Sequence, residues 1–329
     1  MSRPVFVIPH FSRTEQSWGF LNRTLASLLE QTDPDWDAVI VDDCSPSSET
    51  AYLLGEARAQ DPARIHVIQK STNEGPGSSR NVGVEWAADR DAPFVLFLDA
   101  DDRAHPNRLR FVRDYFKRRP DVSFIYSTFE VINEHEQPVP VEDLTPSIRE
   151  ILNGHASDPV EGPDQWLRVA LEKGYTTCTS TVAVRTYLAA AHPFPHTFVS
   201  EDSHTWFRML AAGTTVGFLN GALTRRRICS SSVKGSSTRQ RFGDDFYWIK
   251  LQVDLDGFTR ALNIARARGT ISDDDEVLIR RGFYLRQAKT MAGEQQERAA
   301  ALCRGLASLT VPETSLRTEP TYAESGAAV

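Results

Sequence analysis

The stretch Phe94–Asp102 reads FVLFLDADD, a run of five apolar residues that ends directly in acidic ones. A short apolar run of this kind is typical of a buried strand. Val5–Pro9 (VFVIP) and Ala38–Val41 (AVIV) have the same form, and the second runs straight into Asp42 and Asp43. Amphipathic stretches separate these runs, and strands that alternate with helices predict βαβ units. We therefore expect an α/β fold with a mostly parallel central sheet flanked by helices.

The pattern changes beyond about residue 130. Pro, Glu and Asp are frequent over Asn133–Pro163, which predicts loops. The next segments predict, in order, a strand, a helix and two more strands: Thr179–Arg185, Ser200–Ala212, Thr214–Leu219 and Ala222–Ile228. Helical patterning dominates from about Gln240 to Leu306, and residues 307–329 have the composition of a disordered tail.

Composition and charge narrow the class of protein. Of the 329 residues, 40% are hydrophobic and 25% are charged, so we expect a packed globular core. The net charge of -7 argues against a dedicated binder of nucleic acid or of anionic membranes. The apolar runs are far shorter than the roughly 20 residues that cross a bilayer, so no integral membrane association is expected. The start MSRPVFVIPH lacks the apolar core of a signal peptide, and the four cysteines lack zinc or redox spacing, which favours a cytoplasmic protein.

Acidic side chains follow two of the predicted strands. In open α/β sheets, ligands bind beyond the carboxyl ends of the strands, and this edge would collect Asp42, Asp43, Asp99, Asp101 and Asp102. Such a cluster is repulsive unless a cation is present, and a few carboxylates together with a phosphate suit Mg²⁺ or Mn²⁺. Each acidic pair alone is equally typical of a turn or a helix cap. Both pairs together, at successive strand ends, favour a site.

A glycine-rich loop is the second candidate for nucleotide binding. Asn73–Gly83 reads NEGPGSSRNVG, whose glycines let the backbone approach a ligand and whose Arg80 offers several donors to a phosphate. A plain loop at the start of a helix explains the same residues equally well. The turn after the first strand, PHFSR over residues 9–13, contains no GxGxxG, and the chain contains no GxxxxGK[ST]. These absences argue against a dinucleotide oxidoreductase and a P-loop enzyme.

Six segments, taken together, resemble one family. They are VFVIPHF (5–11), VDDCS (41–45), NEGPGSSRNVG (73–83), FLDADD (97–102), TSTVAVR (179–185) and SEDSHTWFRMLAAG (200–213). Their order and spacing resemble family 2 of the inverting glycosyltransferases, which has the GT-A fold. The resemblance spans residues 1 to about 232 and does not cover those beyond about 240.

The resemblance implies a role for each matching position on the donor side. It implies that Pro9 and Phe11 border the nucleobase pocket, and that Asp42 or Asp43 contacts the base and the ribose. It also implies that Asn73 and Arg80 support the nucleotide. The segment Asp99-Ala100-Asp101 resembles the family's DxD element. It implies Asp101 as the direct metal ligand and Asp99 nearer the donor sugar and ribose, with Asp102 as a helper.

On the acceptor side, Glu201-Asp202 resembles the family's acidic pair, which implies Asp202 as the general base. A carboxylate there removes the proton of the acceptor hydroxyl as it attacks the anomeric carbon, and one in-line displacement inverts that carbon. The alternative is an acidic first turn that stabilises the helix dipole, and without the upstream motifs it would be favoured.

The chain departs from the family's pattern at one point. An arginine followed by a histidine and serines is frequent there, whereas residues 224–232 read TRRRICSSS and contain no histidine. A third protein ligand to the metal is therefore in question. Arg226, Arg227 or Lys234 would instead meet the diphosphate, with Ser230–Gly235 as a lid. A solvated basic strand end is an equal alternative.

The sequence thus predicts a soluble glycosyltransferase that uses a UDP- or dTDP-sugar, Mn²⁺ or Mg²⁺, and an acceptor hydroxyl of unknown identity. We expect a GT-A domain over residues 1–235, with a nucleotide-sugar half (1–130) and an acceptor half (131–235), and a helical extension over residues 236–306 that offers a surface for a homodimer. A sugar-phosphate nucleotidyltransferase is one alternative, but it needs a basic glycine-rich loop directly after the first strand. A non-catalytic module that binds nucleotide-sugars is the other.

Overall fold

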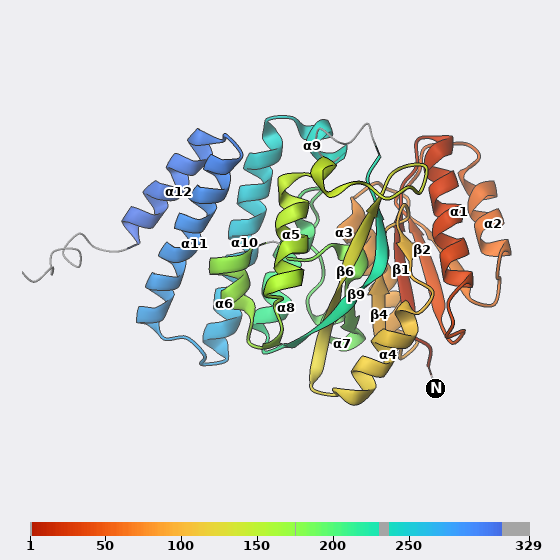
Figure 1. Ribbon diagram of the computed structural model, residues 1–329, viewed down its shortest axis with the longest axis horizontal. Coiled ribbons are helices and arrows are strands. Elements are labelled where there is room, and N and C mark those ends of the chain that lie inside the picture. The colour runs from red at the N-terminus through yellow and green to blue at the C-terminus, as the bar shows by residue number, and fades with distance from the viewer. Residues whose placement is uncertain (1, 175, 230–236, 311–329) are drawn as a thin grey trace, which may run out of the picture. The chain divides into compact units, whose positions relative to one another are not determined.

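The computed structural model describes residues 2–174, 176–229 and 237–310 (Figure 1). The chain divides into two compact units, Met1–Arg268 and Gly269–Val329. The first unit therefore extends beyond residue 235, where the sequence predicts the end of the GT-A domain. The predicted lid (230–235) and Lys234 lie outside the described residues, as does the predicted tail beyond residue 310.

Within the described residues, nine strands form one sheet in the order β3-β2-β1-β4-β8-β6-β9-β5, with β7 paired to β9. The strands are β1 Val5–His10, β2 Asp37–Asp42, β3 Ile65–Gln69, β4 Phe94–Phe97, β5 Arg103–Ala104, β6 Val122–Ile132, β7 Gly162–Pro163, β8 Ala183–Arg185 and β9 Thr215–Arg227. The part from β3 to β4 is parallel, as predicted. Antiparallel pairs enter with β8, which lies between β4 and β6.

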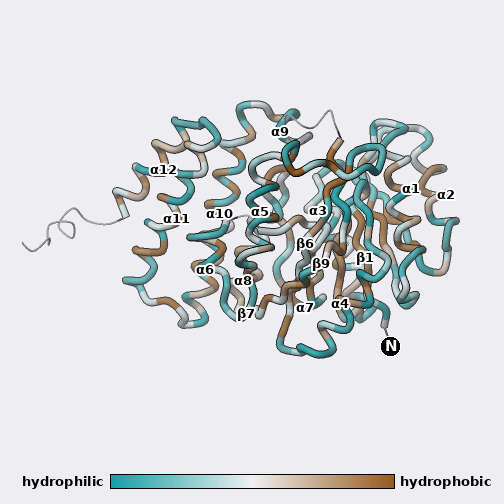
Figure 2. Tube along the Cα trace, in the orientation of Figure 1, coloured by the Kyte–Doolittle hydropathy of each residue, from teal (hydrophilic) through white to brown (hydrophobic). Residues whose placement is uncertain are grey.

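Helices flank the sheet in the first unit (Figure 1). They are α1 Glu15–Leu29, α2 Thr50–Ala59, α3 Pro76–Ala88, α4 Arg108–Arg118, α5 Pro146–Ser157, α6 Trp166–Arg168, α7 Thr186–Ala191, α8 Glu201–Ala211, α9 Ser237–Phe242 and α10 Asp245–Ala267. The strands β1, β2 and β4 are buried almost throughout, and apolar residues follow the central strands (Figure 2). The α/β prediction is confirmed. No helix of the described part is long and apolar enough to cross a membrane.

Two glycines allow α3 to lie close to its neighbours. Gly75 precedes the helix with φ 93°, a conformation that side chains other than glycine rarely adopt, and Pro76 starts the first turn. A Cβ at Gly83 would lie 2.4 Å from a methyl carbon of Val7 on β1, so only glycine fits there. This close approach sets the position of Arg80, one turn before Gly83.

The second half of the sheet differs from the sequence prediction in three places. The two strands predicted over Thr214–Leu219 and Ala222–Ile228 form one strand, β9, because β9 pairs with β6 on both sides of residues 220–221. The predicted loops of Asn133–Pro163 contain α5, which Thr145 caps by accepting a hydrogen bond from the Ile148 amide. Thr179–Arg185 is only half strand: a turn of 3₁₀ helix, Thr179–Thr181, precedes β8.

The second unit contains two helices, α11 Asp273–Gly293 and α12 Glu297–Leu309. Ser272 caps α11 by a capping box, in which its hydroxyl accepts from the Asp275 amide and the Asp275 carboxylate accepts from the Ser272 amide. Phe283 and Met291 on α11 and Cys303 on α12 are buried. The helical patterning predicted up to Leu306 is confirmed.

Candidate active site

The ends of β1 and β2 are joined by a buried carboxylate. His10 lies opposite Asp42 in the parallel register, and its Nδ1 lies 3.0 Å from Asp42 Oδ1. Asp42 also accepts hydrogen bonds from the amide and the hydroxyl of Ser45, at 3.1 Å and 2.5 Å. Burial opposes ionisation, but the bonds from His10 and Ser45 hold the pKa of Asp42 below its ordinary value. Asp42 is 0% exposed, so its contacts serve the two strand ends.

Asp43 holds the glycine-rich loop. Its oxygens accept from the Gly75 amide at 2.7 Å, the Glu74 amide at 3.1 Å and Lys70 Nζ at 2.6 Å. Lys70 was missed from the sequence, although its place directly after β3 matches that of the other strand-end residues. On this loop Asn73 is exposed. Asp43 thus fixes the backbone on which a nucleotide-binding residue would stand.

The predicted border of the nucleobase pocket lies at the end of β1. Pro9 is buried within that strand, where it pairs with Val41 of β2. Phe11 follows the strand and is half-buried, and the Arg13 guanidinium lies 5.2 Å from the centre of its ring. Of the two predicted residues, Phe11 presents a side chain that a ligand can contact.

Arg80 joins the two halves of the candidate site. Its Nη2 donates to Asp99 Oδ1 at 2.7 Å, and its Nη1 donates to Glu201 Oε1 at 2.9 Å. Glu201 is 121 positions away along the chain, yet both carboxylates contact one guanidinium. The Arg80 side chain is only 4% exposed, so the pairing is desolvated. Arg80 was predicted to support the nucleotide; it holds the two acidic elements together.

The DxD element lies directly after β4, and its carboxylates take different directions. The Asp99 side chain is 33% exposed, and its amide donates to Ser180 Oγ at 2.9 Å. Asp101 is exposed, while Asp102 is buried and accepts from the Arg227 amide at 2.7 Å. Asp99 and Asp101 therefore remain accessible, and Asp102 faces β9.

The described residues contain no group of three His, Cys, Asp or Glu side chains with the arrangement of a complete metal site. Carboxylates are hard oxygen donors, and Mg²⁺ is usually held by one or two of them together with substrate phosphates. Asp99 and Asp101 fit that requirement. Ala100 between them contributes structure, because its carbonyl accepts from Thr24 Oγ1 at 2.9 Å.

The two arginines at the end of β9 differ in environment. The Arg227 side chain is 0% exposed and donates to the carbonyls of Asp101 and Asn133 and to Glu136 Oε1. It was predicted to meet the diphosphate, but these contacts already engage it. Arg226 is half-buried, and it lies opposite Val131 of β6 in the strand register.

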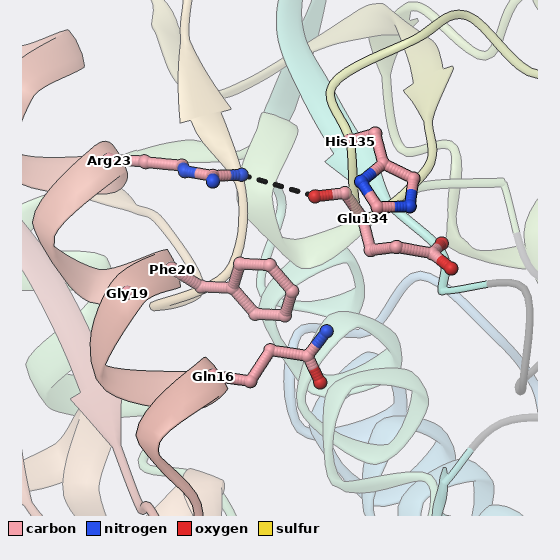
Figure 3. A pocket seen from close by; sticks show the side chains of 6 residues that line it. All are labelled: Gln16, Gly19, Phe20, Arg23, Glu134 and His135. Atoms are coloured by element: carbon pink, nitrogen blue, oxygen red, sulfur yellow. Dashed lines mark hydrogen bonds between the residues drawn. The ribbon is translucent and has the colours of Figure 1, made fainter.

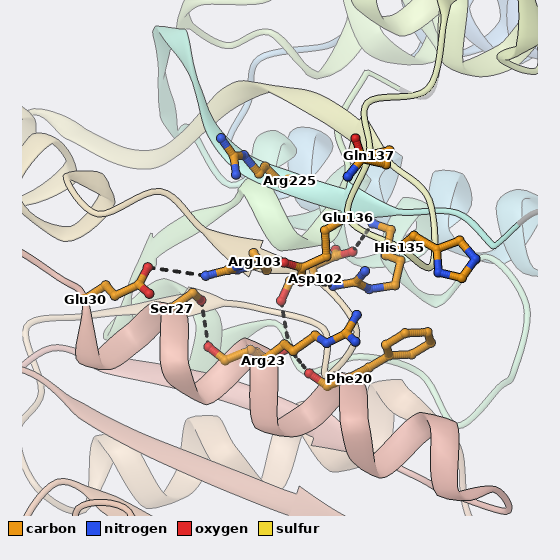
Figure 4. Close-up of polar contacts among 12 residues, drawn as sticks. Phe20, Arg23, Ser27, Glu30, Asp102, Arg103, His135, Glu136, Gln137 and Arg225 are labelled. Atoms are coloured by element: carbon orange, nitrogen blue, oxygen red, sulfur yellow. Dashed lines mark hydrogen bonds and ion pairs between the residues drawn. The ribbon is translucent and has the colours of Figure 1, made fainter.

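Further ion pairs fix the turn that Arg227 contacts. Arg103 on β5 donates to Glu136 Oε2 at 2.7 Å and also reaches Glu30 on α1, at 3.3 Å (Figure 4). The turn is therefore held both from β5 and from β9. This is a structural role for the basic residues near the strand end.

Glu201 and Asp202 form the first turn of α8. Glu201 is buried, and burial together with the charge of Asp202 raises its pKa to about 7 although Arg80 opposes this. Asp202 is half-buried; its Oδ2 accepts from Thr179 Oγ1 at 3.3 Å, and its Oδ1 accepts from the Ser203 amide at 2.8 Å. Glu201 thus faces the protein, and Asp202 is the more accessible carboxylate of the pair.

Two hollows of the described residues are lined by other side chains than those of the acidic residues. One, of about 230 Å³, lies between α1 and the turn at residues 133–137, where Arg23 donates to the Glu134 carbonyl and His135 stands close by (Figure 3). The other, of about 360 Å³, is lined by residues of β6, of the segment 138–145 and by Ile228. Asp99, Asp101 and Asp202 line neither hollow.

The sequence of the chain is similar to those of known glycosyltransferases. The model of the family "Glycosyl transferase family 2" matches residues 5–168, which include the DxD element but not Glu201-Asp202. The putative teichuronic acid biosynthesis glycosyltransferase TuaG of Bacillus subtilis is 26% identical over 74% of this chain and 86% of its own. An uncharacterized glycosyltransferase of Haemophilus influenzae is 30% identical over 42% of this chain and 45% of its own.

Among solved structures, S. aureus TarS 1-349 in complex with UDP-GlcNAc has a similar fold. The TM-score is 0.54, the sequences are 18% identical, and the match covers 93% of this chain and 91% of that one. At this identity the likeness concerns the fold, and it supports the GT-A architecture. The family match includes four of the six segments, those between residues 5 and 102. The chain belongs to glycosyl transferase family 2 and is a glycosyltransferase.

Proposed function

We propose that this enzyme transfers a sugar from a UDP- or dTDP-sugar to an acceptor hydroxyl, with Mn²⁺ or Mg²⁺ at the diphosphate and inversion of the anomeric carbon. One observation carries the proposal: Arg80 binds Asp99 of the DxD element and Glu201 of the acidic pair at the same time. The donor and acceptor elements therefore belong to one cluster.

The donor side rests on the strand-end residues. Phe11 is half-exposed beside the ends of β1 and β2, and Asn73 stands exposed on the loop that Asp43 holds. S. aureus TarS, which shares the fold, forms complexes with UDP-GlcNAc and UDP, which supports a uridine nucleotide as the first donor to test. Of the two arginines predicted to meet the diphosphate, Arg226 is the candidate to test, because Arg227 is engaged with backbone carbonyls. Lys234, the third basic residue predicted for this role, lies outside the described residues.

Asp101, together with Asp99, would hold the divalent cation, which would supply positive charge to the leaving diphosphate. Asp99 keeps one oxygen free of the Arg80 contact, and Asp101 is exposed. Asp102 is not needed for this role, because the Arg227 amide occupies its carboxylate.

Asp202 is the proposed general base. It takes the proton of the acceptor hydroxyl as that oxygen forms a bond to the anomeric carbon. The bond between that carbon and the diphosphate oxygen breaks on the opposite side, and the nucleoside diphosphate leaves with the electron pair. Glu201 is held by Arg80 behind Asp202, so it fixes the turn and does not meet the acceptor.

We assign donor binding to residues 1–130 and acceptor binding to residues 131–235, which are the two halves predicted from the sequence. A homodimer through the C-terminal helices and a cytoplasmic location stay predictions. The name of TuaG refers to teichuronic acid biosynthesis, so the sugars of teichuronic acid are acceptors to screen first, beside small metabolites.

Calorimetric titration of UDP and UDP-sugars, with Mn²⁺ and with EDTA, tests the proposal. We expect binding that needs the cation and that weakens by about 10-fold or more in Asp101→Ala, with UDP released from the correct donor when an acceptor is present. If no nucleotide-sugar binds or releases UDP under either condition, the proposal is wrong. Pyrophosphate release from a nucleoside triphosphate and a sugar 1-phosphate would instead identify a nucleotidyltransferase.

A further inference from the structure

The acidic pair follows a residue with unusual backbone geometry. Ser200, the N-cap of α8, has φ 60° and ψ 22°, the left-handed conformation that residues other than glycine rarely adopt. Serine at this position usually caps a helix by accepting from a backbone amide, but no such bond forms here. Something other than capping must therefore keep Ser200 in this conformation.

The partner of Ser200 is a buried carboxylate on α10. Ser200 Oγ donates to Asp254 Oδ1 at 2.5 Å, across 54 positions of the chain. Asp254 is 2% exposed, and its other oxygen accepts from Lys250 Nζ, one turn earlier on the same helix. A buried charge without partners is energetically unfavourable, so the bonds from Ser200 and Lys250 stabilise the Asp254 carboxylate. The same bonds fix the side chains of Ser200 and Lys250. Both lie outside the segment 5–168 that the family model matches.

The position of α10 against α8 is fixed by a second contact. A Cβ at Gly257 would lie only 2.6 Å from the Cα of His204, so the two helices approach too closely for any side chain there. His204 Nε2 lies 2.7 Å from Asp256 Oδ2 on the exposed side of the contact. The helices therefore meet in one register, and that register brings Asp254 to Ser200.

A left-handed residue sets the direction in which the next helical turn starts. Without the hydrogen bond to Asp254, Ser200 would relax toward the negative φ that residues other than glycine usually adopt. The first residues of α8 would then change direction. Glu201 would then move relative to Arg80, and Asp202 relative to Asp99. Misplacement of a reacting group by about 1 Å lowers rates by roughly 10²-fold. We propose that Asp254 is a positioning residue for transfer, which holds Ser200 in the conformation that directs Glu201 and Asp202 into the site; this rests on the proposed function.

The test compares Asp254→Ala and Asp254→Asn with a matched control, Asp245→Asn, which removes an exposed carboxylate from the first turn of the same helix. With UDP-GlcNAc or the best donor found, kcat and KM are measured, together with the affinity for UDP and Mn²⁺. We expect Asp254→Ala to lower kcat by about 10- to 100-fold while the UDP Kd stays within about 2-fold. Asp254→Asn keeps an oxygen that accepts from Ser200, so it recovers part of the rate, and Asp245→Asn changes kcat by less than about 3-fold.

Ser200→Ala guards against a variant that does not fold, because it removes the same bond and leaves Asp254 paired with Lys250. It should lower kcat like Asp254→Ala, and the double variant should lose no more than either alone. A wild-type kcat in Asp254→Ala or Ser200→Ala, or an equal loss in Asp245→Asn, would overturn the positioning role and leave the proposed function intact. A wild type that neither binds UDP nor turns over any donor would overturn both.

Discussion

The two acidic pairs of the candidate site, Asp42-Asp43 and Glu201-Asp202, are held in place differently. Asp42 and Asp43 bind amides and side chains of the strand-end loops around them, such as those of Ser45 and Gly75. Glu201 depends on Arg80, 121 positions away.

The turn that carries Glu201 and Asp202 depends on a distant element as well. Ser200, which starts it, depends on Asp254 of α10. On the proposed donor side, the acidic pair is therefore held by residues of the motifs around it. On the proposed acceptor side, the acidic pair is held by tertiary contacts with distant elements. Variants that act on one side and spare the other therefore test this comparison.

The largest effect is expected on the acceptor side, from Asp202→Asn. The amide cannot take up the proton of the acceptor, so kcat should fall by about 10³-fold or more, within the usual range for a general base. The donor side is untouched, so the affinity for UDP with Mn²⁺ should not change. Steady-state kinetics and calorimetry on the same preparation check both halves. Transfer that survives at the wild-type rate would remove Asp202 from the reaction.

Arg80→Ala should break the link between the two sides. It leaves Asp99 and the buried Glu201 without their common hydrogen-bond donor, and the loss of such a donor costs about 1–3 kcal/mol of unfolding free energy. The control is Arg225→Ala, whose partner Glu130 is exposed, and we expect less than about 1 kcal/mol there. Urea denaturation measures both values. Equal, small losses in the two variants would mean that Arg80 does not hold the halves together.

Gly83→Ala perturbs the donor side alone. The new methyl group would lie 2.4 Å from a methyl carbon of Val7 and push α3 away from β1, at about 1–3 kcal/mol. Gly55→Ala in α2 is the matched control, because nothing lies within 4 Å of its Cβ, and the helix should gain about 0.5–1 kcal/mol. Opposite signs in thermal unfolding are expected. The same sign for both would show that α3 is not packed as described.

The last effect is a pH dependence of the folding stability on the acceptor side. Burial and the charge of Asp202 raise the pKa of Glu201 from 4.5 to about 7. Between these values the folded protein binds more protons than the unfolded chain, so stability falls as pH rises through that window. Glu201→Gln lacks this titration.

The measurement is urea denaturation of the wild type and of Glu201→Gln at several pH values. The free energy of unfolding of the wild type, relative to the variant, should decrease by up to about 1.4 kcal/mol per pH unit between pH 4.5 and pH 7. A difference that is flat or that rises over this range would contradict the raised pKa.

Much of the donor side could be predicted from the sequence, because its strands and loops carry local signals. The apolar runs that end in Asp42 and Asp99 became β2 and β4, and NEGPGSSRNVG starts α3 at Pro76 as a glycine-proline pair should. Family membership also followed from motifs in order. What these positions contact depends on the packed fold.

The contacts of several other residues could not be predicted from the sequence, because they form only in the tertiary structure. Asp102 and Arg227 lie within predicted site segments, yet β9 passes beside the DxD element and turns both into structural contacts. Asp254 carries no local sign of its contact with Ser200, since the two meet only when α10 lies against α8. The helix α5 did have a local signal, Thr145-Pro146, which is typical of a helix start and was outweighed by the polar composition around it.

All the proposed roles require that the acidic residues of the two sides serve one nucleotide-sugar site. Its most direct test is UDP release from UDP-GlcNAc, or from the best donor found, with Mn²⁺ and an acceptor, measured beside UDP binding in the wild type, Asp101→Ala and Asp202→Asn. We predict that Asp101→Ala weakens UDP binding by about 10-fold or more and slows UDP release. Asp202→Asn should bind UDP like the wild type and release it about 10³-fold more slowly. If Asp101→Ala binds and turns over normally, or if Asp202→Asn keeps full release, the two sides do not form one catalytic site.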